Sequence, residues 1–211
     1  MFEWLIKFFK NPSKTFSEEA QDSMKKFLIV GLGNIGEKYT NTRHNIGFKI
    51  LDYFASKNDL NFETQKLGDI TSFKFKGRTF ILLKPSTYMN LSGKSVLYWL
   101  TKEKIPVENL LVVTDDLNIP FGTLRVKTKG SDGGHNGLKD IQDKLNTTNY
   151  NRFRFGISDV FGKGKQVDYV LSDWDKEELE KLPERLDKSI DVIKSFGTAG
   201  IKHTMNDFNG K

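Results

Sequence analysis

Cysteine is absent from the 211-residue chain, and histidine is scarce. Without cysteine there is no disulfide, no thiol nucleophile and no thiolate metal site, and the composition suits a reducing compartment such as the cytosol. The histidines, His44, His135 and His203, lack the spacing of metal ligands, so no zinc site is expected. No apolar stretch approaches the ~20 residues that a membrane-spanning helix requires.

Basic residues are in modest excess, with 33 Lys and Arg against 27 Asp and Glu and a net charge of +6. This balance favours a polyanionic partner, although charge alone does not distinguish such a protein from any other basic soluble one. Hydrophobic residues make up 37% of the chain and aromatic residues 12%, which is typical of a packed globule. The length suits one α/β domain.

Residues 1–25 are interpreted as an extension ahead of this domain. An apolar head at residues 1–9 precedes a polar, linker-like stretch that contains Pro12. The head is too short to span a membrane and lacks the small-residue cleavage site of a signal peptide. A short interfacial helix is one interpretation, and packing against the domain or a partner is the simpler one.

The most informative stretch starts at residues 27–30, four apolar residues typical of a buried strand. Glycines follow at positions 31, 33 and 36, and apolar residues resume on a helical period at 46–57. An open α/β sheet places its site in such a loop, at the end of a buried strand. The loop carries Asn34, Tyr39, Arg43, His44 and Asn45.

The spacing Gly31-x-Gly33-x-x-Gly36 also matches a dinucleotide-binding fingerprint. That motif requires a helix that begins at the glycines, and an acidic residue at the end of a second strand about 20 residues later. Here the helix signal begins near Ile46, and Asp52 lies inside it. A nicotinamide-dependent dehydrogenase is therefore the weaker alternative, and it would require detectable dinucleotide binding.

The rest of the chain alternates strand and helix patterns. We expect a hairpin at 71–84, strands at 109–114, 123–127 and 152–157, and helices at 92–102, 138–145, 176–182 and 184–196. Pro183 is expected to separate the last two helices. The tail after residue 198 is expected to fray, and the side chains of Arg152 and Arg154 are expected to point outward. The predicted fold is a single α/β domain, a twisted mixed β-sheet flanked by helices.

Two further features point to a site. Asp115 and Asp116 follow a buried strand, and strand-end carboxylates of an α/β sheet point into the site crevice. A glycine-rich loop at 130–137 precedes a helix, and its amides suit an anion or a carbonyl oxygen. The alternative for this loop is a plain turn with Asn136 as the N-cap residue.

Four motifs occur in order along the chain. They are Gly-Leu-Gly-Asn-x-Gly-x-x-Tyr-x-x-Thr-Arg-His-Asn-x-Gly at 31–47, Lys-Pro-x-Thr-x-Met-Asn-x-Ser-Gly at 84–93, Asp-Asp-Leu at 115–117 and Gly-Gly-His-Asn-Gly-Leu-Lys at 133–139. Together they closely resemble the bacterial-type peptidyl-tRNA hydrolases. The resemblance covers about residues 26–205, and leaves 1–25 as an extension and 206–211 as a tail.

The resemblance implies hydrolysis of the ester between a peptide and the 3′ end of tRNA, which recycles tRNA during translation. The resemblance implies no metal or cofactor. It also implies that the protein is a cytoplasmic monomer and that its partner is peptidyl-tRNA. By the family's pattern, His44 is the catalytic base, Asp115 orients it, and Asn90 lies beside the scissile ester. The expected substrate-binding residues are Asn34, Tyr39, Met89, Asn90 and Asn136, with Asn45 supporting the loop.

The chemistry of these residue types agrees with that assignment. A neutral histidine is a well-matched base near pH 7, and a carboxylate fixes its tautomer and offsets the charge it gains. The amide of Asn90 suits a developing oxyanion. No serine or cysteine nucleophile motif is present, which favours direct attack by water. Whether Asp115 or Asp116 faces His44 depends on strand phase, and His135 is expected to organise its loop, with catalysis or RNA contact as the alternative.

Phosphate contacts with tRNA are expected at Lys127, Arg154, Lys163 and Lys165, because such contacts read no base sequence. The chain departs from the family's pattern at 129–132 and 158–161, which leaves the contacts around 158–165 open. The alternative function is a non-catalytic RNA-binding relative, since chloroplast intron-splicing factors resemble the same family. Intact His44, Asp115 and asparagines favour the enzyme.

Overall fold

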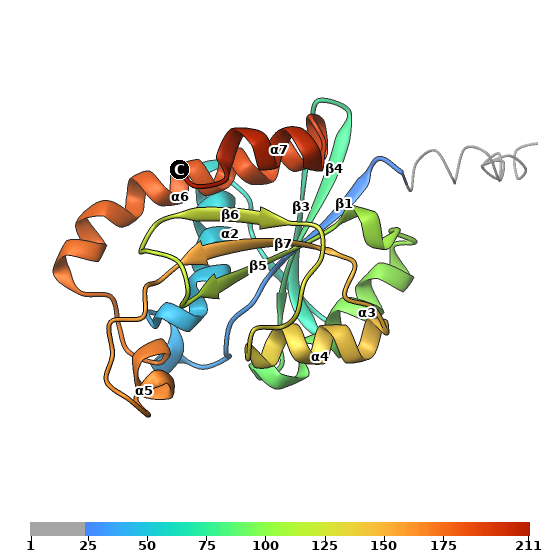
Figure 1. The fold of residues 1–211 in the computed structure, drawn as a ribbon. Helices are drawn as coiled ribbons and strands as arrows, with labels where there is room; N and C mark the ends of the chain where they lie inside the picture. Colours follow the sequence, from blue (N-terminus) through green and yellow to red (C-terminus); the bar gives the residue numbers. More distant parts are fainter. Residues whose placement is uncertain (1–23) are drawn as a thin grey trace, which may run out of the picture.

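The computed structural model describes residues 24–211, so the apolar head expected at the N-terminus lies outside the described residues. The strands are β1 Lys26–Gly31, β2 Glu63–Gln65, β3 Gly68–Phe75, β4 Arg78–Pro85, β5 Leu110–Asp116, β6 Leu124–Lys127 and β7 Asn151–Gly156. They form one seven-stranded sheet in the order β2-β3-β4-β1-β5-β7-β6 (Figure 1). The strands near the centre, β4, β1, β5 and β7, are parallel, and β2, β3 and β6 pair antiparallel at the two sides.

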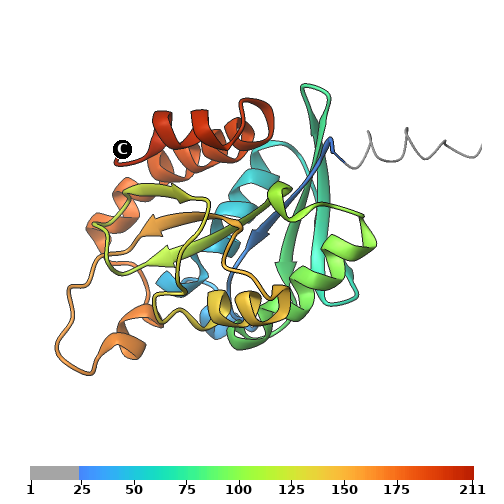
Figure 2. The ribbon, with the colours of Figure 1, turned by 45° about the vertical axis from the view of Figure 1, so that its right-hand side comes forward.

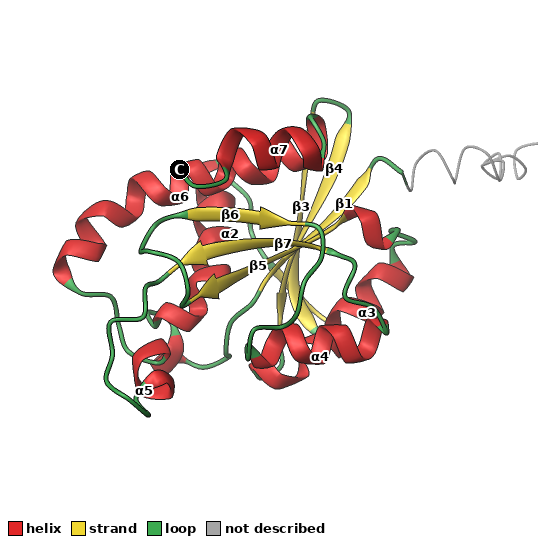
Figure 3. Ribbon diagram, in the orientation of Figure 1, coloured by secondary structure: helices red, strands yellow, loops and turns green. Residues whose placement is uncertain are grey.

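Helices cover both faces of the sheet. They are α2 Ile46–Lys57, α3 Ser92–Lys102, α4 Asn136–Leu145, α5 Gln166–Val170, α6 Lys176–Thr198 and α7 Ile201–Phe208. Short 3-10 turns lie at η1 Glu37–Tyr39, η2 Arg43–Asn45, η3 Met89–Leu91 and η4 Val107–Asn109. The helices α2, α6 and α7 lie on one face, and α3 and α4 lie on the other (Figure 2, Figure 3). This arrangement is the predicted mixed α/β sheet flanked by helices.

Alternation along the strands divides the core between these two layers. In β1, Ile29 packs toward α2 and α6, whereas Leu28 and Val30 pack toward α3 and α4. All three side chains are fully buried. A strand buried on both faces explains the continuous apolar run at residues 27–30, and each such side chain contributes about 1.5–3 kcal/mol of stability.

The prediction of two helices broken at Pro183 was wrong, because α6 is continuous and Pro183 lies inside it. A capping box between Asp175 and Glu178 starts the helix. Its apolar stripe continues past the proline, with Leu182 and Leu186 both buried in the core. Packing of this stripe outweighs the hydrogen bond that a proline removes.

The tail predicted to fray after residue 198 is ordered. The helix α7 ends at Phe208, so the expected boundary at 205 falls within it. The side chain of Asn209 then accepts a hydrogen bond from the Val126 N–H at 2.6 Å and donates one to the Val126 carbonyl at 3.1 Å. These bonds imitate a neighbouring strand and satisfy the outer edge of β6, the kind of edge that otherwise invites pairing with another chain.

Arg152 was also predicted incorrectly. Its side chain is buried, and one guanidinium nitrogen donates to the carbonyls of Gly130 and Thr148 at 2.8 and 3.1 Å. The guanidinium lies 4.0 Å from the centre of the Tyr150 ring. Arg152 therefore supports the loop that leads from β6 to α4. Within residues 24–211, no helix combines the length and the apolar composition needed to cross a membrane.

Candidate active site

A cleft of about 540 Å³ opens at the edge of the sheet where β1 and β5 end. Parallel strands bring their carboxyl ends to one edge, so loops that are distant in the sequence meet there. The loop after β1, the end of β5 and the loop before α4 supply its polar lining. These elements contribute Asn34, His44, Asp115 and His135, while Asn136 at the start of α4 and Arg154 of β7 complete the polar lining. The helix α5, which the sequence did not predict, adds Val167 and Val170.

The glycines of the first motif hold a helix against a strand. A Cβ atom at Gly31 would collide with the backbone oxygen of Gly47, at the start of α2, and one at Gly47 would meet the backbone of Leu32. The helix begins at Ile46, well beyond the glycines. Their spacing therefore serves close packing of α2 on β1, and the helix does not start where a dinucleotide fold would need it.

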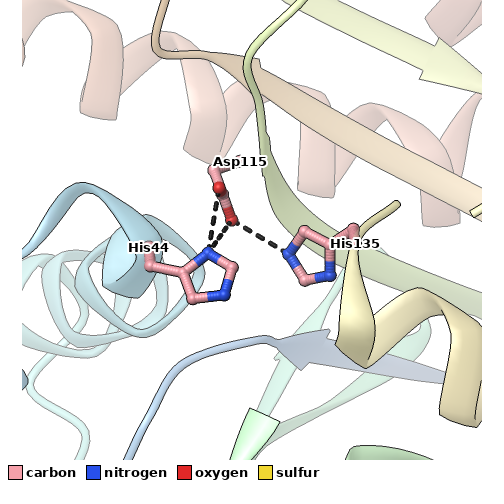
Figure 4. Close-up of side chains that lie close together, drawn as sticks. All are labelled: His44, Asp115 and His135. Carbon is pink, nitrogen blue, oxygen red and sulfur yellow. Dashed lines mark hydrogen bonds and ion pairs between the residues drawn. The ribbon is translucent and has the colours of Figure 1, made fainter. Parts of the chain in front are cut away.

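His44 and Asp115 form a direct pair. The Nδ1 atom of His44 lies 3.0 Å from each carboxylate oxygen of Asp115 (Figure 4). The two side chains are only 13% and 3% exposed. The other ring nitrogen of His44, Nε2, points away from Asp115 (Figure 4). A neutral imidazole that donates from Nδ1 to a carboxylate has an unprotonated Nε2, which can accept a proton.

Electrostatics reinforce this pair. Burial opposes ionisation of Asp115, but the imidazoles of His44 and His135 outweigh it and hold the pKa of the carboxyl well below its usual range. Burial also lowers the pKa of His44, whereas the charge of Asp115 and the hydrogen bond to it raise that pKa, and the net shift is upward. The pair thus combines a permanently ionised carboxylate with an imidazole of increased basicity.

His135 is a second imidazole in contact with Asp115. Its Nε2 atom lies 3.0 Å from Asp115 Oδ1 and 2.7 Å from Thr114 Oγ1. Its Nδ1 atom accepts hydrogen bonds from the backbone N–H groups of Gly137 and Leu138 at 3.1 and 3.3 Å. His135 is thus the N-cap of α4, so the alternative interpretation, with Asn136 as the N-cap residue, was wrong on this point. The expectation that His135 organises its loop fits this geometry.

The neighbouring carboxylate has a different partner. Asp116 Oδ2 accepts a hydrogen bond from Arg154 at 3.0 Å, and Asp116 Oδ1 accepts the Asn118 N–H at 2.9 Å. Strand alternation therefore directs Asp115 toward His44 and Asp116 toward Arg154. The arginine, a predicted phosphate contact, lines the cleft as half of an ion pair.

Two hydrogen bonds join the side chain of Asn45 to the backbone of Asn34 within the loop after β1. The side chain of Asn45 accepts the Asn34 N–H at 2.8 Å and donates to the Asn34 carbonyl at 2.9 Å. The Oδ1 atom of Asn34 accepts the Met89 N–H at 3.0 Å. This last bond uses the acceptor of the Asn34 amide, so its NH₂ group is the part left to donate into the cleft.

Some of the other expected site residues line the cleft, and others lie outside it. Met89, Asn90 and Asn136 line the cleft together with Asn34. Tyr39, in η1, is not among the lining residues, and the Lys38 amine lies 4.8 Å from the centre of its ring. The predicted phosphate contacts Lys127, Lys163 and Lys165 are exposed and lie outside the lining, and Lys165 pairs with Asp168 at 3.2 Å.

Comparison with known proteins agrees with this architecture. A family model described as peptidyl-tRNA hydrolase matches residues 28–211. The chain belongs to the peptidyl-tRNA hydrolase family. Among its relatives, the peptidyl-tRNA hydrolase of Parabacteroides distasonis is 55% identical over 186 residues, covering 88% of this chain and 100% of the relative. The enzyme of Phocaeicola vulgatus is 56% identical with the same coverage.

A solved structure of the family has the same fold. The crystal structure of peptidyl-tRNA hydrolase from Acinetobacter baumannii superposes with a TM-score of 0.82 at 33% identity, covering 88% of this chain and 95% of that one. The mixed sheet and its flanking helices are therefore those of the peptidyl-tRNA hydrolase family.

One arginine of this family member was overlooked as a structural residue. Arg43, next to His44, forms a buried ion pair with Glu178 of α6 at 2.5 Å and donates to Ser172 Oγ at 2.6 Å. Its guanidinium also lies 4.6 Å from the Tyr169 ring centre and 5.6 Å from that of Trp174. The arginine thereby ties the histidine's loop to the segment that follows α5. No local pattern predicts this burial, because every partner is more than 120 residues away.

Within the described residues, His44, Asp115 and His135 offer potential ligand atoms that lie within 4.8 Å of one another. The same atoms form the hydrogen bonds that join these side chains (Figure 4). The three side chains are thus joined by hydrogen bonds, an arrangement that suits acid–base chemistry.

Proposed function

We propose that this protein hydrolyses the ester that joins a peptide to the 3′ end of tRNA, using water activated by His44. The observation that carries the proposal is the contact between His44 Nδ1 and Asp115, which leaves Nε2 available in the cleft. Membership of the peptidyl-tRNA hydrolase family supports the choice of substrate. We further propose that the protein acts as a cytoplasmic monomer.

In the proposed reaction, Nε2 of His44 removes a proton from a water molecule as the water oxygen attacks the ester carbonyl carbon. Asp115 keeps the Nδ1–H tautomer and offsets the positive charge on the imidazolium. The tetrahedral intermediate then collapses, the bond to the ribose oxygen breaks, and His44 returns its proton to that oxygen. The products are a peptide with a free carboxylate and a tRNA with a free hydroxyl.

Amide side chains are proposed to hold the substrate. The NH₂ group of Asn34 is free to donate, and Asn90 and Asn136 are exposed on the cleft lining. We assign Asn90 to the oxyanion, where one donor typically contributes about 10²–10³-fold in rate. Amides that meet the peptide backbone suit an enzyme that accepts many peptide sequences.

Arg154 is proposed to contact tRNA phosphate at the cleft. Its partner Asp116 already holds the guanidinium in position at 3.0 Å. The exposed lysines Lys127, Lys163 and Lys165 are proposed as further phosphate contacts. These contacts add affinity and orientation and no base specificity.

The direct test is release of N-acetyl-amino acid from N-acetyl-aminoacyl-tRNA, with and without a chelator. Turnover that the chelator leaves unchanged supports the proposal. A protein that binds the tRNA and releases nothing would instead be a non-catalytic RNA-binding relative.

A further inference from the structure

We propose that His135 is a positioning residue, whose fixed Nε2–H holds the Asp115 carboxylate in the orientation that His44 needs. The inference rests on the proposed function of His44 as the base. It starts from the carboxylate of Asp115, which contacts two neighbouring imidazoles whose ring centres are 4.8 Å apart (Figure 4). Although both rings contact the carboxylate, their remaining nitrogens have different surroundings.

The hydrogen bonds of His135 assign its tautomer. Backbone N–H groups of Gly137 and Leu138 donate to Nδ1, so Nδ1 carries no proton and the ring proton lies on Nε2. That proton is directed at Asp115 Oδ1 and Thr114 Oγ1. Nδ1 is thus engaged by both backbone bonds at the start of α4. The ring is therefore a neutral donor with no nitrogen free for the reaction.

The hydrogen bond that His135 Nε2–H donates to Asp115 has two effects. It restrains rotation of the carboxylate, whose side chain is 3% exposed, so that both oxygens stay 3.0 Å from His44. It also withdraws part of the negative charge that would otherwise act on the His44 imidazolium. Losing the donor should strengthen the attraction of Asp115 for a protonated His44 while allowing the pair to misalign.

The other charged groups of the cleft lining do not replace this donor. Asp116 is paired with Arg154, and Asp132 Oδ1 accepts the Gly134 N–H at 2.8 Å. Arg43, beside His44, is paired with Glu178. Among the charged groups of the cleft lining, His135 thus gives Asp115 its second imidazole contact, on the Oδ1 atom that His44 also contacts.

Two substitutions separate the cap from the contact with Asp115. In H135N, the shorter amide oxygen can occupy the Nδ1 position and cap α4, but nothing reaches Asp115. In H135Q, the longer amide nitrogen can occupy the Nε2 position and donate to Asp115, while the cap is weakened. Unfolding temperature should therefore fall more in H135Q, and kcat should fall more in H135N, by about tenfold for one lost hydrogen bond to a charged group.

The pH profile adds a readout that a structural cap would not move. The acid limb of kcat/KM should shift to higher pH in H135N and stay at the parental position in H135Q. Nitrogen NMR of the parent protein should place the His135 proton on Nε2 at neutral pH, a result that needs no turnover. A proton on Nδ1, or a loss of kcat that simply follows unfolding temperature across the two variants, would overturn the proposal; an inactive parent would instead contradict the proposed function.

Discussion

Nδ1 of His44 lies 3.0 Å from the carboxylate of Asp115, although 71 residues separate them in the chain. Their meeting follows from the pairing of β1 with β5, in which Val30 is aligned with Val112. The loop after β1 and the end of β5 then emerge side by side at one edge of the sheet. Gly31 and Gly47 let α2 approach closely enough to bring His44 over that edge.

Replacing His44 by alanine should abolish the proposed turnover and leave tRNA affinity nearly unchanged. The base contributes on the order of 10²–10⁴-fold in rate, whereas phosphate contacts supply most of the affinity. Single-turnover release from N-acetyl-aminoacyl-tRNA and a filter-binding titration measure the two quantities. H203A, at an exposed histidine of α7, is the matched control. Parental turnover in H44A would exclude this base.

The D115N substitution should lower the rate and move the acid limb of kcat/KM to lower pH. The proposed base is neutral His44, and the Asp115 charge raises the pKa of that imidazole from its ordinary value of 6.5. Removing the charge therefore lowers the pKa, so neutral His44 persists to lower pH. The maximal rate falls because the amide no longer offsets the imidazolium. In D116N the acid limb of kcat/KM should stay at the parental pH, since Asp116 pairs with Arg154. Identical pH profiles for the parent, D115N and D116N would contradict the mechanism.

Breaking the Arg43–Glu178 pair should destabilise the fold. The two side chains are 7% and 10% exposed, so R43Q leaves a buried carboxylate without its cation. We expect the free energy of unfolding to fall by about 3–5 kcal/mol, measured by urea denaturation. K165Q, which breaks a pair with side chains 69% and 71% exposed, should cost less than about 1 kcal/mol. Equal losses in both variants would show that burial does not set the effect.

Elements encoded by local patterns could be predicted closely from the sequence. The helical period at 46–57 corresponds to α2, and the turn at Gly77 joins β3 to β4. The errors arose where a distant partner overrides the local signal. Core packing carries α6 through Pro183, and the edge of β6 orders the tail through Asn209. Neither partner can be inferred from the few residues on either side.

The same distinction applies to the site. Motif spacing and family resemblance selected His44, Asp115 and the asparagines of the cleft lining, which the sheet topology brings together. The contact of His135 with Asp115 was not predicted, because a loop histidine carries no signal of its ring orientation. The α5 wall of the cleft was missed for a similar reason: five residues, Gln166–Val170, contain too little periodicity to indicate a helix.

Salt should weaken tRNA binding without slowing the chemistry. Each phosphate contact releases counterions, so the logarithm of affinity should fall linearly with the logarithm of salt concentration. If Arg154, which lines the cleft, makes the phosphate contact that we propose, R154Q should reduce that slope by about 1. Turnover of a minimal ester substrate without tRNA should change little over the same range, since the buried His44–Asp115 pair is screened weakly. A parental slope in R154Q would remove this arginine from the tRNA interface, and salt inhibition of the minimal substrate would show that ions reach the catalytic pair itself.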